Sequence, residues 1–211
     1  MYMRADLHVK RRSRHVTAHR TQQERSTRTR ALLLDATIDC LVELGYAHTT
    51  VIEICQRAGV SRGAQQHHFT TKADLMTSAL EHLFTRLAAK ILDGDLPTGP
   101  DRLEKGIDLL WEAYSGALST AAVELWVAAR TDEELRASLL PVDRALGHTT
   151  LEFYRRLVGA PDVPADPTEL ETVLLLTVHL FRGLALDAMI GGDPGRRTAL
   201  IADWKSRVLP R

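Results

Sequence analysis

One segment of the chain, Thr49–Lys72 (TTVIEICQRAGVSRGAQQHHFTTK), constrains the fold more than any other. Thr49 is of a residue type that caps helix N-termini, so we expect a helix to begin there. Gly59 should end that helix, because glycine adopts a positive φ without strain. Ser61 is the expected cap of a second short helix. Two short helices around a tight glycine turn are the arrangement that lays a recognition helix in the major groove of DNA.

The rest of the chain is also predicted to be helical. Before the motif, four apolar residues recur at the spacing of one helix face (Leu34, Ile38, Leu41 and Leu44). A further helix is expected from about Lys72 to Leu92, followed by five or six more, one of them interrupted at Pro141. Aromatic residues make up only 5% of the chain, which favours helices over strands. The predicted fold class is all-α, with a three-helix helix-turn-helix domain followed by a second helical domain.

The net charge of zero conceals an uneven distribution. Residues 1–30 hold nine Lys and Arg against two acidic residues, a balance of +7, so the remainder of the 211-residue chain sums to −7. Residues 1–26 lack apolar periodicity and are predicted to form a basic, disordered arm. A basic arm on a mildly acidic body indicates a polyanionic partner for the arm alone, while a solvated tail without a role is the alternative.

The motif and its flanks resemble the N-terminal domain of the TetR family of transcriptional regulators across about residues 27–75. The positions that carry the resemblance are Leu44-Gly45-Tyr46, Thr49-Thr50, Ile54, Ala58-Gly59-Val60-Ser61, Gly63, His68-Phe69, Lys72 and Leu75. A weaker resemblance covers residues 124–136. The chain departs from the family at Gln66, where Tyr or another apolar residue is common, and this departure affects the DNA contact rather than the fold.

The resemblance implies which residues meet DNA. Thr49 and Thr50 should bind phosphate at a helix N-terminus, helped by the helix dipole, and Lys72 should hold a second phosphate. The recognition helix should present Arg62, Gly63, Gln65, Gln66 and His67. Arginine reads guanine and glutamine reads adenine through paired hydrogen bonds. In the arm, Arg28 and Arg30 are expected to reach phosphates or the adjacent minor groove, which would give the arm much of the salt-dependent affinity.

For the second domain, residues 76–211, the resemblance implies effector binding and dimerisation. The candidate ligand contacts are Trp111, Tyr114, Trp126, His148, Phe153 and His179. The candidate dimer contacts are Leu176, Leu180, Gly183, Leu184, Leu200 and Trp204, on two helices that would form a four-helix interface. The expected effector is small and mostly apolar, and its binding would pull the fourth helix. For each aromatic and histidine, ordinary core packing is the alternative.

The implied function is a ligand-released repressor that binds a palindromic DNA operator as a homodimer in the cytoplasm. The same fold serves activators, and a DNA-binding protein without an effector is a further alternative. An enzyme is the rival class, but paired Glu-x-x-His motifs, phosphate loops and cysteine clusters are missing from the sequence. We therefore predict no catalytic residue, metal or cofactor. Val173–Ile190 resembles a membrane span in its apolar character, but it carries Arg182 and Asp187, which favours burial against protein.

Overall fold

The computed structural model describes residues 6–92, 96–158 and 167–209, and within these ranges the chain forms nine helices and no strand. The helices are α1 Asp6–His48, α2 Val51–Ala58, α3 Arg62–His68, α4 Lys72–Leu92, α5 Arg102–Tyr114, α6 Ala117–Ala129, α7 Glu133–Val158, α8 Pro167–Met189 and α9 Pro194–Val208. The all-α fold class is confirmed.

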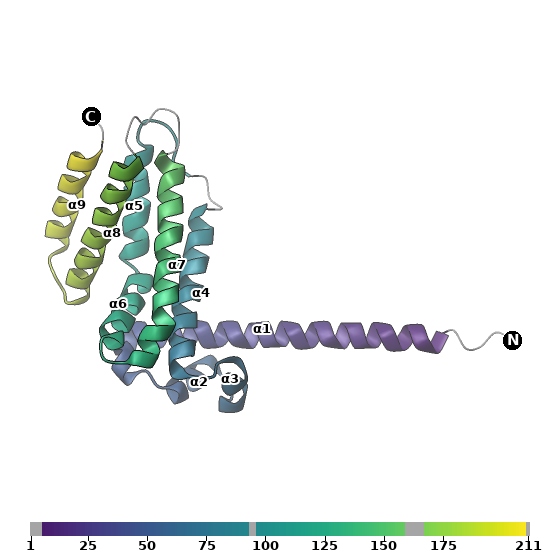
Figure 1. Ribbon diagram of the computed structural model, residues 1–211. Coiled ribbons are helices and arrows are strands. Elements are labelled where there is room, and N and C mark those ends of the chain that lie inside the picture. The colour runs from purple at the N-terminus through teal and green to yellow at the C-terminus, as the bar shows by residue number, and fades with distance from the viewer. Residues whose placement is uncertain (1–5, 93–95, 159–166, 210–211) are drawn as a thin grey trace.

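The helices form an upright bundle above a small helix-turn-helix unit (Figure 1). Helix α1 crosses the base of the bundle and extends well beyond it, with α2 and α3 beneath. Helix α4 packs against both α1 and α7, and α6 packs against α1. Helices α5, α8 and α9 form the opposite side of the bundle. Helices α2 and α3 pack directly against α1, and α1 in turn packs against α4 and α6, so the helix-turn-helix unit is joined to the body through packed helices.

Two clusters of buried apolar residues stabilise this arrangement. The larger one joins α1, α2, α4, α6 and α7 through side chains that include Leu41, Ile54, Leu80, Leu125 and Leu139. Each fully buried aliphatic side chain contributes about 1.5–3 kcal/mol relative to an exposed one. The core of the helix-turn-helix unit thus continues without interruption into the body of the protein.

The second cluster joins α5, α8 and α9. It contains Ile107, Val178, Phe181 and Ile201, and the ring of Trp111 meets Phe181 edge-on with centroids 5.3 Å apart. This cluster keeps α8 against the bundle on one side and leaves its other side exposed.

Two glycines form the bends that place the small helices. Gly45 has φ 72° and ψ 169°, which breaks the helical path near the end of α1, and Gly59 lies in the left-handed region with φ 64° and ψ 31°. Ser61 caps α3 by accepting a hydrogen bond from the backbone N–H of Ala64 at 3.2 Å. The predicted helix end at Gly59 and the predicted cap at Ser61 are confirmed.

The structure differs from three sequence expectations. Helix α1 includes residues 6–26, where the sequence predicted a disordered arm; this stretch contains neither Gly nor Pro, so nothing in it breaks a helix that continues from the buried part of α1. Helix α7 runs through Pro141 without interruption, because Leu139 and Leu146 on either side pack into the same core. The cap of α2 is Thr50 rather than Thr49.

Candidate DNA-reading surface and ligand cavity

Helix α3 presents one polar face to solvent. Arg62, Gly63, Gln66 and His67 are all exposed, as the sequence predicted for a recognition helix. Together these residues offer a fork of guanidinium donors, an amide, an imidazole and a bare backbone position, which are the groups that read base edges in the major groove. The opposite face of α3 packs inward, so the exposed face is the one available to DNA.

Gln65 belongs to the inward face, which corrects the prediction that it meets DNA. Its side chain is 4% exposed, and its amide Nε2 donates a hydrogen bond to the backbone carbonyl of Phe69 at 3.3 Å. Phe69 is itself buried, as predicted. The role of Gln65 is therefore to close the C-terminal end of α3 over the core.

The two threonines before α2 have different roles. Thr50 is exposed and accepts a hydrogen bond from the backbone N–H of Glu53 at 3.2 Å, which caps the helix and leaves the residue at its positive end. Thr49 is fully buried, and its hydroxyl donates to the carbonyl of Gly45 at 2.7 Å. The predicted phosphate contact is thus compatible with Thr50, whereas the hydroxyl of Thr49 is committed to the bend.

Lys72 binds a backbone group within the chain. Its Nζ donates to the backbone carbonyl of Tyr46 at 3.3 Å and lies 4.2 Å from the centroid of the Tyr46 ring. Burial lowers the pKa of this lysine. The ammonium group therefore binds the end of α1. Because it has three donors and is half-buried, its predicted phosphate contact stays a prediction.

Tyr46 is the centre of a contact that the sequence did not predict. Its backbone N–H donates to Glu124 of α6 at 2.8 Å, and its hydroxyl donates to Asp132 at 2.9 Å. Burial, followed by the hydrogen bond to Asp132, raises the pKa of Tyr46 to about 12, so the hydroxyl remains a donor. We call Tyr46, Lys72, Glu124 and Asp132 the Tyr46 corner; it joins the DNA-reading unit to α6 and to the start of α7.

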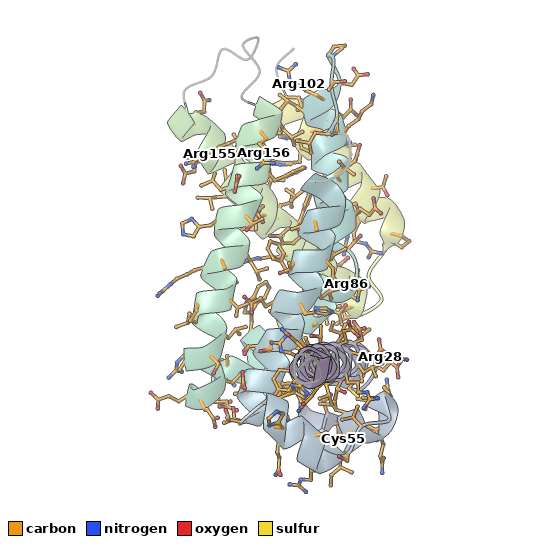
Figure 2. The ribbon with its side chains drawn as sticks, turned by 90° about the vertical axis from the view of Figure 1, so that its right-hand side faces the viewer. Arg28, Cys55, Arg86, Arg102, Arg155 and Arg156 are labelled. Atoms are coloured by element: carbon orange, nitrogen blue, oxygen red, sulfur yellow. The ribbon has the colours of Figure 1, made fainter. Side chains whose placement is uncertain are left out.

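The two arm arginines lie on α1. Figure 2 looks along this helix, with Arg28 on it and Cys55 of α2 below. Arg28 is exposed, and Arg30 is exposed with its guanidinium 5.2 Å from the centroid of the Phe69 ring. Arg30 lies beside the end of α3, which fits a contact to the DNA that α3 would read. The DNA contact of Arg28 stays a prediction.

A cavity lies within the bundle. The centre of a water-sized sphere can occupy about 60 Å³ of it, and the space between its walls, open solvent included, is about 720 Å³. It is enclosed by residues of α4, α5, α6, α7 and α8: Phe84, Leu87, Ala88, Leu110, Ala113, Tyr114, Leu118, Ser119, Ala122, Trp126, Leu146, Thr149, Thr150, Phe153 and Arg182. Three of the six predicted ligand contacts, Tyr114, Trp126 and Phe153, belong to this lining. Its walls are mostly apolar with a few polar groups, which is the usual make-up of a small-molecule site.

The other three predicted contacts lie outside the lining. Trp111 packs in the second apolar cluster, and His148 is exposed on α7. His179 is also exposed, with its Nδ1 2.7 Å from the carbonyl of Leu175. Residue type alone could not separate these side chains from the lining, because each one's position around its helix decides which face it takes. Arg182 also lines the cavity, although it was not among the predicted contacts; its charge within an apolar helix is the signal that could have identified it.

An apolar face of α8 and α9 is exposed. It contains the predicted dimer residues Leu176 and Leu200, which are 54% and 43% exposed, together with the exposed Gly183. Two other predicted dimer residues have partners within the chain: Leu184 is buried, and Trp204 donates its indole N–H to Thr177 at 2.9 Å.

Leu180, the last of the predicted dimer residues, is half-buried beside the second cluster. The segment Glu171–Met189 is long and apolar enough to span a membrane by length and composition, and one third of it is buried. Its inward face belongs to the second cluster, which fits a helix packed against protein on one side.

An exposed reading helix on an all-helical body defines the class of this protein as a helix-turn-helix DNA-binding transcriptional regulator. Residues 33–79 match the family described as bacterial regulatory proteins, tetR family. An HTH-type transcriptional regulator of Mycobacterium tuberculosis is 33% identical over 170 residues, covering 79% of this chain and 86% of that protein. The HTH-type transcriptional regulator CymR of Pseudomonas putida is 28% identical, covering 84% and 87% respectively. The chain belongs to the TetR family.

Solved structures agree with this assignment. A transcriptional regulator from Rhodococcus sp. Rha1 superposes with a TM-score of 0.62 at 28% identity, covering 84% of this chain and 92% of its own. A TetR-family regulator from Rhodococcus sp. has a TM-score of 0.66 at 21% identity, which shows the shared fold. These relatives are regulators, so the protein is not an enzyme. Within the part of the chain described by the structure, no group of three or more His, Cys, Asp or Glu is placed to hold a metal ion.

Gln65 and Gln66 are adjacent on α3 and provide a matched test of which face of this helix is buried and which is exposed to DNA. We expect Gln65→Ala to lower the free energy of unfolding by about 1–3 kcal/mol, because the Phe69 carbonyl loses its buried donor. Gln66→Ala should change stability by less than about 0.5 kcal/mol and should instead weaken binding to the preferred DNA sequence. Urea unfolding followed by circular dichroism, with DNA titration of both variants, measures the two effects; equal destabilisation by both substitutions would contradict the assignment.

Proposed function

We propose that this TetR-family regulator is a repressor that binds a palindromic operator as a homodimer and is released from it by a small molecule. The observation that carries the DNA-binding part is the exposed face of α3, with Arg62, Gln66 and His67 beside the exposed Thr50 at the start of α2. The helix-turn-helix framework fixes both helices on the core of α1 and α4. Phosphate contacts at α2 and Arg30 would set the register, and α3 would read the bases.

The homodimer is supported by the exposed apolar face of α8 and α9. Leu175, Leu176 and Leu186 on α8 and Leu200 on α9 are each at least 43% exposed. A monomer that left these side chains in water would forgo the stabilisation that burial brings. A second copy of this chain packed there would form a four-helix interface and place two α3 helices about 34–36 Å apart, which is one turn of DNA.

Release by a ligand is supported by the position of α6 and α4 between the cavity and the DNA-reading unit. Helix α6 contributes Ser119, Ala122 and Trp126 to the cavity and Glu124 to the Tyr46 corner. Helix α4 contributes Phe84 and Leu87 to the cavity and begins at Lys72. A ligand that displaces either helix would move the end of α1 and change the separation of the reading helices. A coupling free energy of about 1–3 kcal/mol between the two sites is enough for a switch.

The experiment that tests the proposal is fluorescence anisotropy of full-length protein with a selected palindromic duplex, its isolated half-site and a random duplex. We expect tight binding to the palindrome and much weaker binding to the other two, because two recognition helices must engage together. Arg62→Ala should cost about 1–3 kcal/mol on the palindrome and relax discrimination at one base position.

Arg144→Ala serves as the matched control, since it removes the same charge from an exposed position on α7. It should leave palindrome binding unchanged. If all duplexes bind equally and Arg62→Ala behaves like Arg144→Ala, the proposed operator recognition is wrong, and the protein binds DNA without sequence selection. If the half-site binds as tightly as the palindrome, the homodimer is rejected.

The basic N-terminal part of α1 has a separate prediction. Removing residues 1–24 eliminates most of the excess positive charge of the arm, so the slope of log affinity against log salt should become shallower. Each lost phosphate contact should reduce the slope by about 0.9. Anisotropy titrations of the full-length and shortened proteins across salt concentrations measure this change. An unchanged slope would show that the arm does not contact phosphate.

The Tyr46 corner is tested by Tyr46→Phe, which removes the hydrogen bond to Asp132 and keeps the ring. We expect a loss of about 1 kcal/mol in stability and weaker operator binding, because the end of α1 and Lys72 are less firmly held. Tyr154→Phe is the control, since Tyr154 is half-buried beside the second cluster. Operator affinity and urea unfolding are measured for both. Retention of full operator affinity in Tyr46→Phe would contradict a positioning role for the corner.

A further inference from the structure

The cavity contains polar groups that its apolar walls leave unsatisfied. Of the side chains that line it, only Arg182 carries a charge. The Nε of Arg182 and the hydroxyl oxygen of Ser119 are both buried and have no hydrogen-bond partner within the described residues. Polar groups buried in proteins are nearly always paired, and an unpaired one is costly. Two such groups in the lining of one cavity indicate that something else supplies their partner.

The guanidinium of Arg182 is held in a fixed position. It lies 4.3 Å from the centroid of the Trp126 ring, and its NH2 group is 3.4 Å from a carboxylate oxygen of Asp143. Arg182 and Thr150 act on the Tyr114 hydroxyl nearby, and both oppose the rise in its pKa that burial causes. The single long contact to Asp143 leaves the donor capacity of the guanidinium largely unused, because this group can form two parallel bonds to one carboxylate.

Tyr114 adds a second donor. Its burial raises the pKa of the phenol, so the hydroxyl stays protonated at neutral pH. The hydroxyl of Ser119 can donate as well. The lining of the cavity therefore contains several donors, while Phe84, Leu87 and Phe153 provide apolar walls.

We propose that the effector is a small apolar molecule with a single carboxylate, which Arg182 binds through its guanidinium with help from Ser119 and Tyr114. This inference rests on the proposed ligand release, because it concerns the same cavity. A cationic ligand would meet the like charge of Arg182, and a neutral ligand would offer the guanidinium an acceptor without the opposite charge of a carboxylate. Asp143 competes with the ligand for Arg182, which provides a test that does not rely on loss of function.

Isothermal titration calorimetry of the full-length protein without DNA tests the proposal. The probes are 4-phenylbutyrate, its neutral amide and 4-phenylbutylamine, which share one apolar body and differ in charge. We expect the carboxylate to bind about tenfold or more tightly than the amide, and the amine not to bind. Arg182→Met should abolish the preference for the carboxylate while leaving the amide affinity nearly unchanged.

Asp143→Asn guards against a loss of binding that reflects misfolding, because it should strengthen binding of the carboxylate severalfold and leave the amide unaffected. Asp101→Asn, which removes the same charge outside the lining, should change neither. Equal affinity for acid and amide, an unaltered acid-to-amide ratio in Asp143→Asn, or no binding of the carboxylate at millimolar concentration would overturn the proposal. Binding of the carboxylate without release of operator DNA would support the ligand class and reject the proposed release.

Discussion

The position of the DNA-reading unit depends on the hydrogen bonds made by Tyr46. Its N–H, carbonyl and hydroxyl each bind a different side chain, from Glu124, Lys72 and Asp132 respectively. Since Gly45 bends the backbone immediately before it, these bonds determine where α1 ends and the loop to α2 begins. The buried Thr49 completes the bend by donating back to the Gly45 carbonyl. A shift of any of these groups would be transmitted to α2 and α3, because both helices follow within a few residues.

Helix α6 connects the Tyr46 corner to the cavity. It is 13 residues long, about 20 Å at the usual rise of an α-helix, and it is largely buried. Trp126 and Glu124 lie two residues apart on this helix, one at the cavity and the other at the Tyr46 corner. Because packed interiors transmit displacement rather than absorb it, movement of Trp126 would alter the hydrogen bond that Glu124 accepts. Under the proposed ligand release, the signal would pass through α6 to α1 as well as through α4.

The sequence predicted the parts of the structure that follow from local chemistry. Gly59 and Ser61 were identified because backbone conformation and capping depend on a few neighbouring residues. The exposed face of α3 was only partly identified: with 3.6 residues per turn, Gln65 and Gln66 point about 100° apart, and only tertiary packing decides which of them is buried. The Tyr46 corner was not predictable, because Tyr46 and Glu124 are 78 residues apart. A pattern within one helix carries no information about such a contact.

The cavity also shows which features of a site can be predicted from the sequence and which cannot. The small number of aromatic residues and of unpaired charges predicted a mostly apolar effector, and the walls of the cavity are mostly apolar. The polar groups of the lining were not predictable from the sequence, because a single arginine in α8 is equally compatible with an ion pair inside the core. The structure separates the two cases through geometry: Arg182 has one long contact to Asp143 and a buried Nε without a partner. The Arg182 side chain is 27% exposed, so its outer donors can meet water, whereas the buried Nε cannot, and leaving a buried donor unpaired costs about 1–3 kcal/mol. The incomplete pairing of Arg182 is therefore better explained by a ligand that completes it.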